Sequence, residues 1–381
     1  MLLEIDQTVV ELFASGQDTE QDRISFCNLA LAQFEGSHRL SGRRPVFSQL
    51  SKLPFLDKRH RAGLEQAYQS ASQNGGLSWR VHTYARVTAS ALASPVSTTE
   101  KNQRVLTFPL KWFDHTERIQ PTSLLGENLS DTHVFLLMGR VGALLANVGR
   151  IPIRAFQRHG GGGATATLLE HIAESGVMCL CIADSDKASP AGTLGSTARA
   201  LQKYKDAARF PLIEVAETAG RDLENGLPDS FYAARYGGHL TYSRVSRLLG
   251  DLTTLGESDI RSHLDIEKGL TLFDVWNYAQ NSDEGSFWIG KLAALMGVLG
   301  HSAGDFRCLT TSVCLHTRRC DCECVIVSGN GANILDDFVD WYEHMDPHAL
   351  KQALDDSVRD EWERLGWMVA SWCCADERVR L

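Results

Sequence analysis

The sequence predicts an α/β protein: a central parallel sheet with helices on both faces, flanked by mainly helical N- and C-terminal regions. Three observations lead to this prediction. Between residues 121 and 235, short apolar runs alternate with helical patterns. One run, VMCLCIAD at 177–184, is almost wholly apolar, as in parallel strands buried on both faces. On either side of 121–235, apolar residues recur at three- and four-residue spacing, which indicates helices. We therefore expect three regions: 1–120, 121–235 and 236–381.

Composition narrows the class of protein. The chain has 381 residues, of which 43% are hydrophobic and 22% charged, the balance of a globular protein with a real core. The formal charge of −9 argues against a uniformly basic nucleic-acid binder but not against a local basic channel. The start has no basic signal region, and no apolar run approaches the roughly 20 residues of a membrane helix. With ten cysteines, these features lead us to expect a cytoplasmic protein with no membrane partner.

The N-terminal region shows helical patterns in TVVELFA, FCNLALAQF and GLEQAYQSAS. The segment at 76–94 is compatible with a helix or a strand, and RVLTFPLKWF at 104–113 contains a candidate strand. We expect this region to be mainly helical.

The central region is expected to run strand, helix, strand, helix, strand, helix, strand. Asp131 stands near the start of the first helix, where a negative charge suits the helix dipole, and Gly176 stands where the second helix would be capped. In such sheets, binding sites form outside the carboxyl ends of the strands. In order, the expected elements are the strand TSLLGE, a helix at 131–149, the strand IPIRAFQ, the glycine loop and helix at 159–176, the strand at 177–184, a helix at 192–208 and the strand FPLIEVAE.

Acidic residues follow two of these strands. Glu127 ends the first strand, and Asp184 and Asp186 end the strand at 177–184. If the chain stays extended, the two aspartates point to the same side. Carboxylates so close repel each other, and a divalent cation such as Mg²⁺ removes that cost. The alternative for the isolated D-x-D is a capped, solvated turn, and for Glu127 a simple loop acid.

At this point the chain resembles the TOPRIM (topoisomerase–primase) domain, whose pattern is a Glu after the first strand and a D-x-D after the third. GENLSDTHVF at 126–135 resembles the first motif, with Asp131 in a second acidic position, and CIADSDK at 181–187 resembles the second. VAETAGRDLENGLPDSF at 215–231 resembles an E-N-x-x-P-like segment of OLD-family nucleases and of stand-alone TOPRIM effectors of bacterial anti-phage systems, with Glu224 as its acid. The resemblance covers about 110 residues, roughly 121–235.

The resemblance implies a Mg²⁺- or Mn²⁺-dependent nuclease, a hydrolase that cleaves phosphodiester bonds in DNA or RNA. Glu127, Asp184 and Asp186 would be its catalytic metal ligands, and Glu224 would support a second cation. Glu127 has the alternative role of general base. A role in antiviral defence, under the control of a separate ATPase protein, is also implied. No tyrosine stands in a context that marks a topoisomerase nucleophile, and primase-like polymerisation ranks last.

The segment RHGGGGAT at 158–165 is the candidate phosphate-binding loop. Glycines before a helix let backbone amides approach a phosphate, so Arg158, His159, Gly161, Gly162 and, beside the D-x-D, Lys187 are candidate substrate-binding residues. The alternative is a flexible surface turn. No G-x-x-x-x-G-K-[ST] motif is present, so we expect no ATPase activity in this chain.

The C-terminal region carries six of the eight tryptophans and a cluster of cysteines. We expect amphipathic helices that pack aromatic faces. This supports a rival function, a non-catalytic assembly protein with a TOPRIM scaffold that binds a partner through this helical domain; homo-oligomerisation is left open. The segment CLTTSVCLHTRRCDCEC at 308–324 has enough cysteines and a histidine for structural Zn²⁺, but alternating cysteines also fit a strand with one buried face, which we favour.

Overall fold

The structure is a computed structural model of the chain and describes residues 1–74, 76–149, 151–238, 242–279, 282–302, 325–343 and 345–380. The chain forms two compact units. The first contains Met1–Ile182, Ala200–Ala216 and Trp362–Leu381, and the second contains Ala183–Arg199 and Glu217–Glu361. These units do not coincide with the expected boundaries at 120/121 and 235/236. The first unit holds nearly all of both large sheets, so the N-terminal region shares a unit with most of the central region, whose segments 183–199 and 217–235 belong to the second unit.

The N-terminal part combines helices with a five-stranded sheet in the order β2-β1-β3-β5-β4. The strands β1, β2, β3 and β5 run parallel, and β4 is an antiparallel edge strand. The candidate strand in 104–113 is confirmed as β5, and the segment at 76–94, left open between helix and strand, contains β3. The other three strands were not predicted, because they are only three to five residues long. The elements are β1 (Leu2–Ile5), α1 (Gln7–Ala14), α2 (Glu20–Glu35), β2 (Arg39–Ser41), α3 (Arg44–Leu50), α4 (Lys58–Asn74), β3 (Thr83–Thr88), β4 (Val96–Glu100), β5 (Gln103–Pro109), η1 (Leu110–Asp114) and η2 (Thr116–Ile119).

The predicted parallel sheet is present between residues 123 and 217, in the order β7-β6-β8-β9. The strand β6 pairs in parallel with both β7 and β8. Hydrogen bonds from Cys179 N to Leu212 O and from Thr218 N to Ala183 O join the starts and the ends of β8 and β9. The elements are β6 (Ser123–Gly126), α5 (Leu129–Leu145), β7 (Phe156–His159), η3 (Gly162–Ala164), α6 (Thr165–Ser175), β8 (Cys179–Ala183), α7 (Ser196–Leu201), η4 (Gln202–Lys205) and β9 (Ile213–Glu217).

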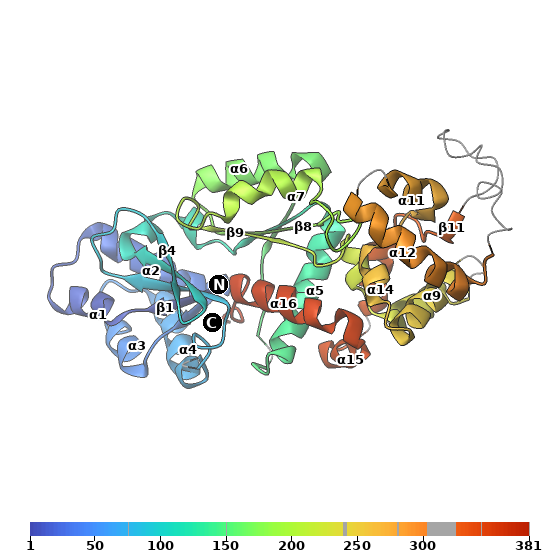
Figure 1. The fold of residues 1–381 in the computed structure, drawn as a ribbon. Helices are drawn as coiled ribbons and strands as arrows, with labels where there is room; N and C mark the ends of the chain where they lie inside the picture. The colour runs from blue at the N-terminus through green and yellow to red at the C-terminus, as the bar shows by residue number, and fades with distance from the viewer. Residues whose placement is uncertain are drawn as a thin grey trace. The chain divides into compact units, whose positions relative to one another are not determined.

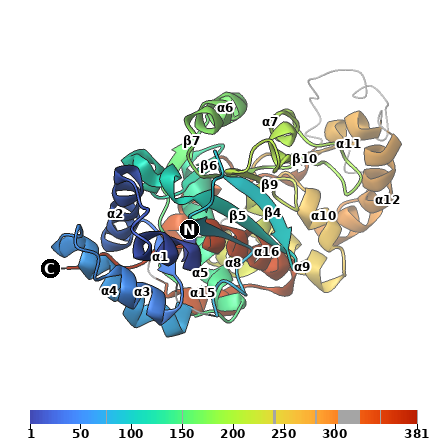
Figure 2. The same cartoon turned by 90° about the vertical axis from the view of Figure 1, so that its left-hand side faces the viewer.

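Helices cover both faces of this sheet, as predicted. Figure 1 shows α6 above β8 and β9 and α5 below them, and the turned view in Figure 2 shows the same layers. All five residues of β8 are buried, as expected for a strand covered on both faces. Two expectations need correction. The strand predicted from Ile151 starts only at Phe156, and the helix predicted over 192–208 is limited to α7 and the 3₁₀ turn η4.

The remaining elements are mainly helical, as expected for the C-terminal region. Trp288 is fully buried and stacks on Tyr278, with 6.1 Å between ring centroids, which confirms the packing of aromatic faces. No helix of the described residues is long and apolar enough to cross a bilayer. The elements are η5 (Leu223–Gly226), α8 (Asp229–Tyr236), α9 (Tyr242–Thr254), α10 (Ser258–His263), β10 (Gly269–Thr271), α11 (Leu272–Ala279), α12 (Ser282–Leu299), β11 (Val325–Ser328), α14 (Ile334–Tyr342), α15 (Pro347–Ala353) and α16 (Asp356–Trp372).

Candidate functional site

The order of the parallel sheet creates a switch point between β6 and β8. From β6 the chain goes outward to β7 and then returns to place β8 on the other side of β6. In open α/β sheets, ligands bind at the carboxyl ends of two neighbouring strands whose connections leave in opposite directions. Glu127 is the residue directly after β6, and Asp184 is the residue directly after β8. The sequence predicted that both acids follow strands; the structure adds that these strands are neighbours, paired with Leu125 opposite Cys181.

Glu127 lies between the end of β6 and the start of α5, and local hydrogen bonds fix this turn. The Asn128 amide donates to the Asp131 carboxylate at 2.7 Å, which forms a capping box at the start of α5. The position of Asp131 near a helix start is therefore confirmed. Asp131 is buried and its carboxylate caps the helix, whereas the Glu127 side chain is half-buried.

The glycine loop is bonded to the same turn. The amides of Gly161 and Gly162 donate to the main-chain carbonyl of Glu127 at 2.9 and 3.5 Å, and Gly160 N donates to Gly126 O at 3.2 Å. Gly161 and Gly162 both have a φ of 66°, which glycine adopts without strain. These three amides hold the turn at Glu127, so they are already occupied by protein carbonyls. The loop thus lies next to the carboxyl end of β6, and its Gly161 and Gly162 amides are bonded to the carbonyl of Glu127 in this structure.

The D-x-D segment is a structured turn rather than an extended chain. The buried Ser185 lies between the two aspartates. Its carbonyl accepts a hydrogen bond from Gly195 N at 2.9 Å, and its amide donates one to Thr218 Oγ1 at 2.9 Å. Asp186 has a φ of 53°, in the left-handed region, and its amide donates to Arg221 O at 2.8 Å. The condition for both carboxylates to point to one side, an extended chain, is therefore not met at Asp186, because Ser185 and Asp186 bond to the turn at 218–221.

Asp186 belongs to a group of charges that the sequence did not reveal. The pKa of Asp222 is raised to about 7. Burial is the largest cause, the nearby Arg221 guanidinium acts in the opposite direction, and the charges of Asp265 and Asp186 add to the increase. Arg221 lies 3.4 Å from Asp222 and 3.1 Å from Asp265, measured between nitrogen and oxygen. Asp222 was visible only as one acid of GRDLENG, and no spacing pattern links it to Asp265.

The E-N-x-x-P-like segment forms the 3₁₀ turn η5. Asn225 is buried and donates from Nδ2 to the carbonyls of Arg261 and Leu264, each at 2.7 Å. Glu224 is half-buried, and its main-chain carbonyl accepts a hydrogen bond from the Tyr232 hydroxyl at 2.8 Å. These bonds fix the turn as part of the framework around α8 and α10.

The predicted basic residues occupy different environments. The Arg158 Nε donates to Ser123 Oγ at 3.1 Å, and the guanidinium lies 5.7 Å from the Phe156 ring centroid. Ser123 starts β6, so this side chain is directed away from the end of β6 that precedes Glu127. His159, the last residue of β7, is exposed. Lys187 is half-buried, and its carbonyl contacts His263 Nδ1 at 2.9 Å.

The sequence predicted two candidate metal sites, one at the strand-end acids and one in the Cys/His segment at 308–324. Among the described residues, no three His, Cys, Asp or Glu side chains are grouped so that they could hold a metal ion. The Cys/His segment at 308–324, with its alternative zinc and buried-strand interpretations, lies outside the described residues. Four other cysteines of the described residues are buried in the first unit: Cys179, Cys181, Cys373 and Cys374.

Comparisons of the chain with protein-family models, with curated proteins and with solved structures found no match, so the candidate site rests on its own geometry.

Proposed function

We propose that this protein is a metal-dependent nuclease with a TOPRIM-like domain, which hydrolyses phosphodiester bonds in nucleic acid with Mg²⁺ or Mn²⁺. The observation that carries the proposal is the strand order. The acids Glu127 and Asp184 directly follow β6 and β8, the two neighbouring parallel strands that flank the switch point of the sheet.

The donor set suits the proposed cation. Carboxylate oxygens are the ligands that Mg²⁺ prefers, and Mg²⁺ is usually held by one or two carboxylates while it keeps several waters and substrate phosphate oxygens. Glu127 and Asp184 supply two carboxylates, so a preformed group of three is not required. A cation bound there would lower the pKa of a water and neutralise charge that develops on the scissile phosphate.

The chain's own residues would keep the two acids in place. Gly161 fixes the main chain of Glu127, and the capping box of Asn128 and Asp131 starts α5 directly after it. Ser185 anchors the residue next to Asp184 to Thr218. Such fixed main chains limit the reorganisation needed when a substrate arrives. Asp186, which bonds to the turn at Arg221, is given no ligand role in this proposal.

The rival function draws little support from the tryptophans that are fully buried. Trp288, Trp362 and Trp372, three of the six after residue 275, build cores and do not present a docking surface. We therefore develop only the nuclease proposal. A defence role, and control by a separate ATPase protein, remain expectations that come from the resemblance alone.

The test is a cleavage assay with the purified full chain. Labelled single-stranded DNA, duplex DNA and transfer RNA are incubated with Mg²⁺ or Mn²⁺, and in parallel with EDTA. We expect cleavage that needs the metal. Asp184→Asn and Glu127→Gln should each reduce it by more than the roughly 10- to 100-fold that loss of an outer partner of a metal ligand typically costs.

Asp360→Asn is the matched control, because Asp360 is an exposed acid on α16. This variant should cleave like the unmodified protein. Unchanged cleavage by Asp184→Asn, or equal cleavage in EDTA, would contradict the proposal. A chain that cleaves none of the three substrates would favour the assembly protein.

A further inference from the structure

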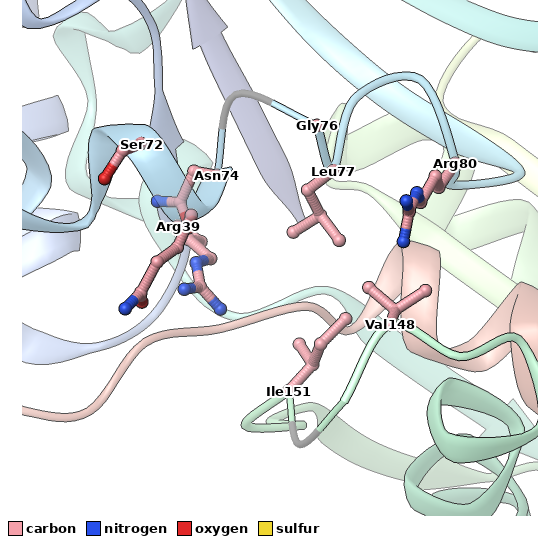
Figure 3. A pocket seen from close by; sticks show the side chains of 9 residues that line it. Arg39, Ser72, Asn74, Gly76, Leu77, Arg80, Val148 and Ile151 are labelled. Atoms are coloured by element: carbon pink, nitrogen blue, oxygen red, sulfur yellow. The ribbon is translucent and has the colours of Figure 1, made fainter.

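A cavity of about 390 Å³ lies in the first unit, among β2, the end of α4 and the segment after α5. It falls in the size range of small-molecule sites, which is roughly 300–1,000 Å³. Figure 3 shows Arg39 and Asn74 together on one side, Arg80 on the other, and Leu77 pointing into the space between them. The lining residues are Arg39, Ser72, Gln73, Asn74, Gly76, Leu77, Arg80, Val148 and Ile151.

Two buried polar atoms on one wall have no hydrogen-bond partner among the described residues. Asn74 is only 1% exposed; its Nδ2 donates to Ser70 Oγ at 3.1 Å, but its Oδ1 accepts no hydrogen bond. The Nε of Arg39 is also buried and donates no hydrogen bond. A buried polar atom without a partner costs free energy, typically 1–3 kcal/mol in order of magnitude, so such atoms beside a cavity point to a ligand.

Within the described part of the chain, the Arg39 guanidinium is paired with one acid, at a distance too long for a hydrogen bond. Its Nε lies 3.9 Å from an Asp376 oxygen. That carboxylate already accepts hydrogen bonds from Gln33 Nε2 and Glu377 N, each at 2.9 Å. The other donors of the fork-shaped guanidinium suit an oxyanion, which a guanidinium binds with two parallel hydrogen bonds.

The opposite wall adds a second positive charge. Arg80 is exposed, and its side chain makes no hydrogen bond or ion pair with the part of the chain that the structure describes. None of the lining residues is acidic, although the chain as a whole carries a formal charge of −9. The cavity is therefore a local positive site on an acidic protein, and it favours an anionic ligand.

The floor between the arginines is apolar. Leu77 and Ile151 are buried at 5% and 6% exposure and belong to a core cluster, against which the half-buried Val148 packs. Figure 3 shows Val148 and Ile151 facing Leu77 across the cavity. A ligand that fills this space needs an apolar or aromatic body as well as an anionic group.

We infer that this cavity binds a nucleoside monophosphate. The phosphate would lie between the guanidiniums of Arg39 and Arg80, the ring would pack on Leu77, Val148 and Ile151, and an N–H or O–H of the ligand would donate to Asn74 Oδ1. A nucleoside monophosphate carries all three features in a molecule of suitable size. The inference does not depend on the proposed nuclease activity, since it uses neither the strand-end acids nor a metal.

Isothermal titration calorimetry of the full chain in EDTA tests the inference. The probes are 5′-AMP, GMP, CMP, UMP, adenosine, ribose 5-phosphate and inorganic phosphate. We expect at least one nucleotide to bind at least about 10-fold more tightly than inorganic phosphate or ribose 5-phosphate, and its nucleoside to show no binding; each tenfold step corresponds to about 1.4 kcal/mol. Because EDTA removes the metal, a failure of the nuclease proposal does not affect this result.

Variants locate the binding. Arg80→Gln should weaken nucleotide binding at least about 10-fold, because a charged hydrogen bond is lost. Arg59→Gln, at an exposed arginine in the first turn of α4, the helix that carries Asn74 at its other end, should bind like the unmodified chain. A Cβ on Gly76 would meet no atom within 4 Å, so Gly76→Asp adds only a negative charge at the cavity and should abolish binding, whereas Gly76→Asn should retain it.

Three results would overturn the inference. The first is that none of the four nucleotides binds at millimolar concentration. The second is binding of adenosine or inorganic phosphate as tight as that of the nucleotide. The third is nucleotide binding that is unchanged in both Arg80→Gln and Gly76→Asp, which would place the ligand elsewhere.

Discussion

The main-chain carbonyl of Glu127 accepts a hydrogen bond from the amide of Gly161, with 2.9 Å between oxygen and nitrogen. This bond joins the turn after β6 to the loop after β7, two segments separated by the whole of α5. The position of Glu127 therefore depends on the conformation of the glycine loop, and a change in the loop should be felt at the acid.

The glycine loop gives the first prediction. A Cβ on Gly160 would overlap the main chain of Thr165, so Gly160→Ala must displace the loop. We expect the free energy of unfolding to fall by about 1–3 kcal/mol, the usual cost of overpacking, and metal-dependent cleavage to weaken with it. Urea unfolding followed by circular dichroism measures the first effect.

Gly163→Ala is the matched control for this prediction. A Cβ at Gly163 meets nothing within 4 Å, and its φ is not in the left-handed region. Its unfolding midpoint should equal or exceed that of the unmodified chain. Equal midpoints for the two variants would show that the loop does not depend on the close approach of Gly160 to Thr165.

The second prediction concerns the carboxyl of Asp222. Its pKa is raised to about 7, first by burial and then, against the Arg221 cation, by the negative charges of Asp265 and Asp186. Asp186→Asn removes one of these charges, so the pKa of Asp222 should fall while burial keeps it above the ordinary value of 3.8. An NMR titration of the Asp222 carboxyl carbon measures the shift.

Asp360→Asn, which removes a charge from the exposed Asp360, should leave that titration unchanged. The raised pKa of Asp222 also determines how this group changes the stability of the protein with pH. Because the folded pKa lies above the unfolded one, the folded state binds more protons between about pH 4 and pH 7, and this group destabilises the protein progressively as the pH rises through that window. A pKa of Asp222 that is identical in Asp186→Asn and the unmodified chain would contradict the proximity of the two carboxylates.

The third prediction concerns the crossing of α5 and α16 beneath the parallel sheet. A Cβ on Gly142 would overlap the main chain of Gly366, so the two helices approach at a pair of glycines. Gly142→Ala should push the helices apart and reduce the free energy of unfolding by about 1–3 kcal/mol. Urea unfolding measures the change.

Gly290→Ala on α12 is the control for the helix crossing, because a Cβ there meets nothing within 4 Å. Alanine has the higher helix propensity, so this variant should be as stable as the unmodified chain or more stable. A Gly142→Ala protein with an unchanged midpoint would mean that the helices separate without cost.

The fourth prediction concerns acid destabilisation. His38 is fully buried, and burial is the main cause that holds its pKa well below 6.5. The unfolded chain takes up a proton there near pH 6.5, but the folded chain does not. Stability from this group is therefore fully present above pH 6.5 and is lost as the pH falls below it, with a slope of up to about 1.4 kcal/mol per pH unit.

His38→Gln keeps a neutral polar side chain, so the loss of unfolding free energy between pH 7 and pH 5 should be smaller than in the unmodified chain. His171→Gln is the control, since the His171 side chain is 72% exposed and should not alter the slope. Urea midpoints measured at pH 5, 6 and 7 compare the three proteins. An equal slope in all three would show that His38 is protonated in the folded state.

The sequence by itself determined those features that depend on a residue and its near neighbours. The buried run of β8, the helix start at Asp131 and the left-handed cap at Gly176 were all predicted, because burial on both faces and helix ends leave local patterns. The placement of Glu127 and Asp184 directly after strands is of the same kind.

Only the tertiary structure decided which strands are neighbours, and with it the switch point between β6 and β8. Strand order is set by how helices and sheets pack, and no run of residues encodes it. The tertiary structure also decided the left-handed conformation of Asp186, whose amide donates to the carbonyl of Arg221. It likewise decided the cavity between Arg39 and Arg80. Such features join residues far apart in the chain, and the free energy that fixes them comes from long-range packing and hydrogen bonds.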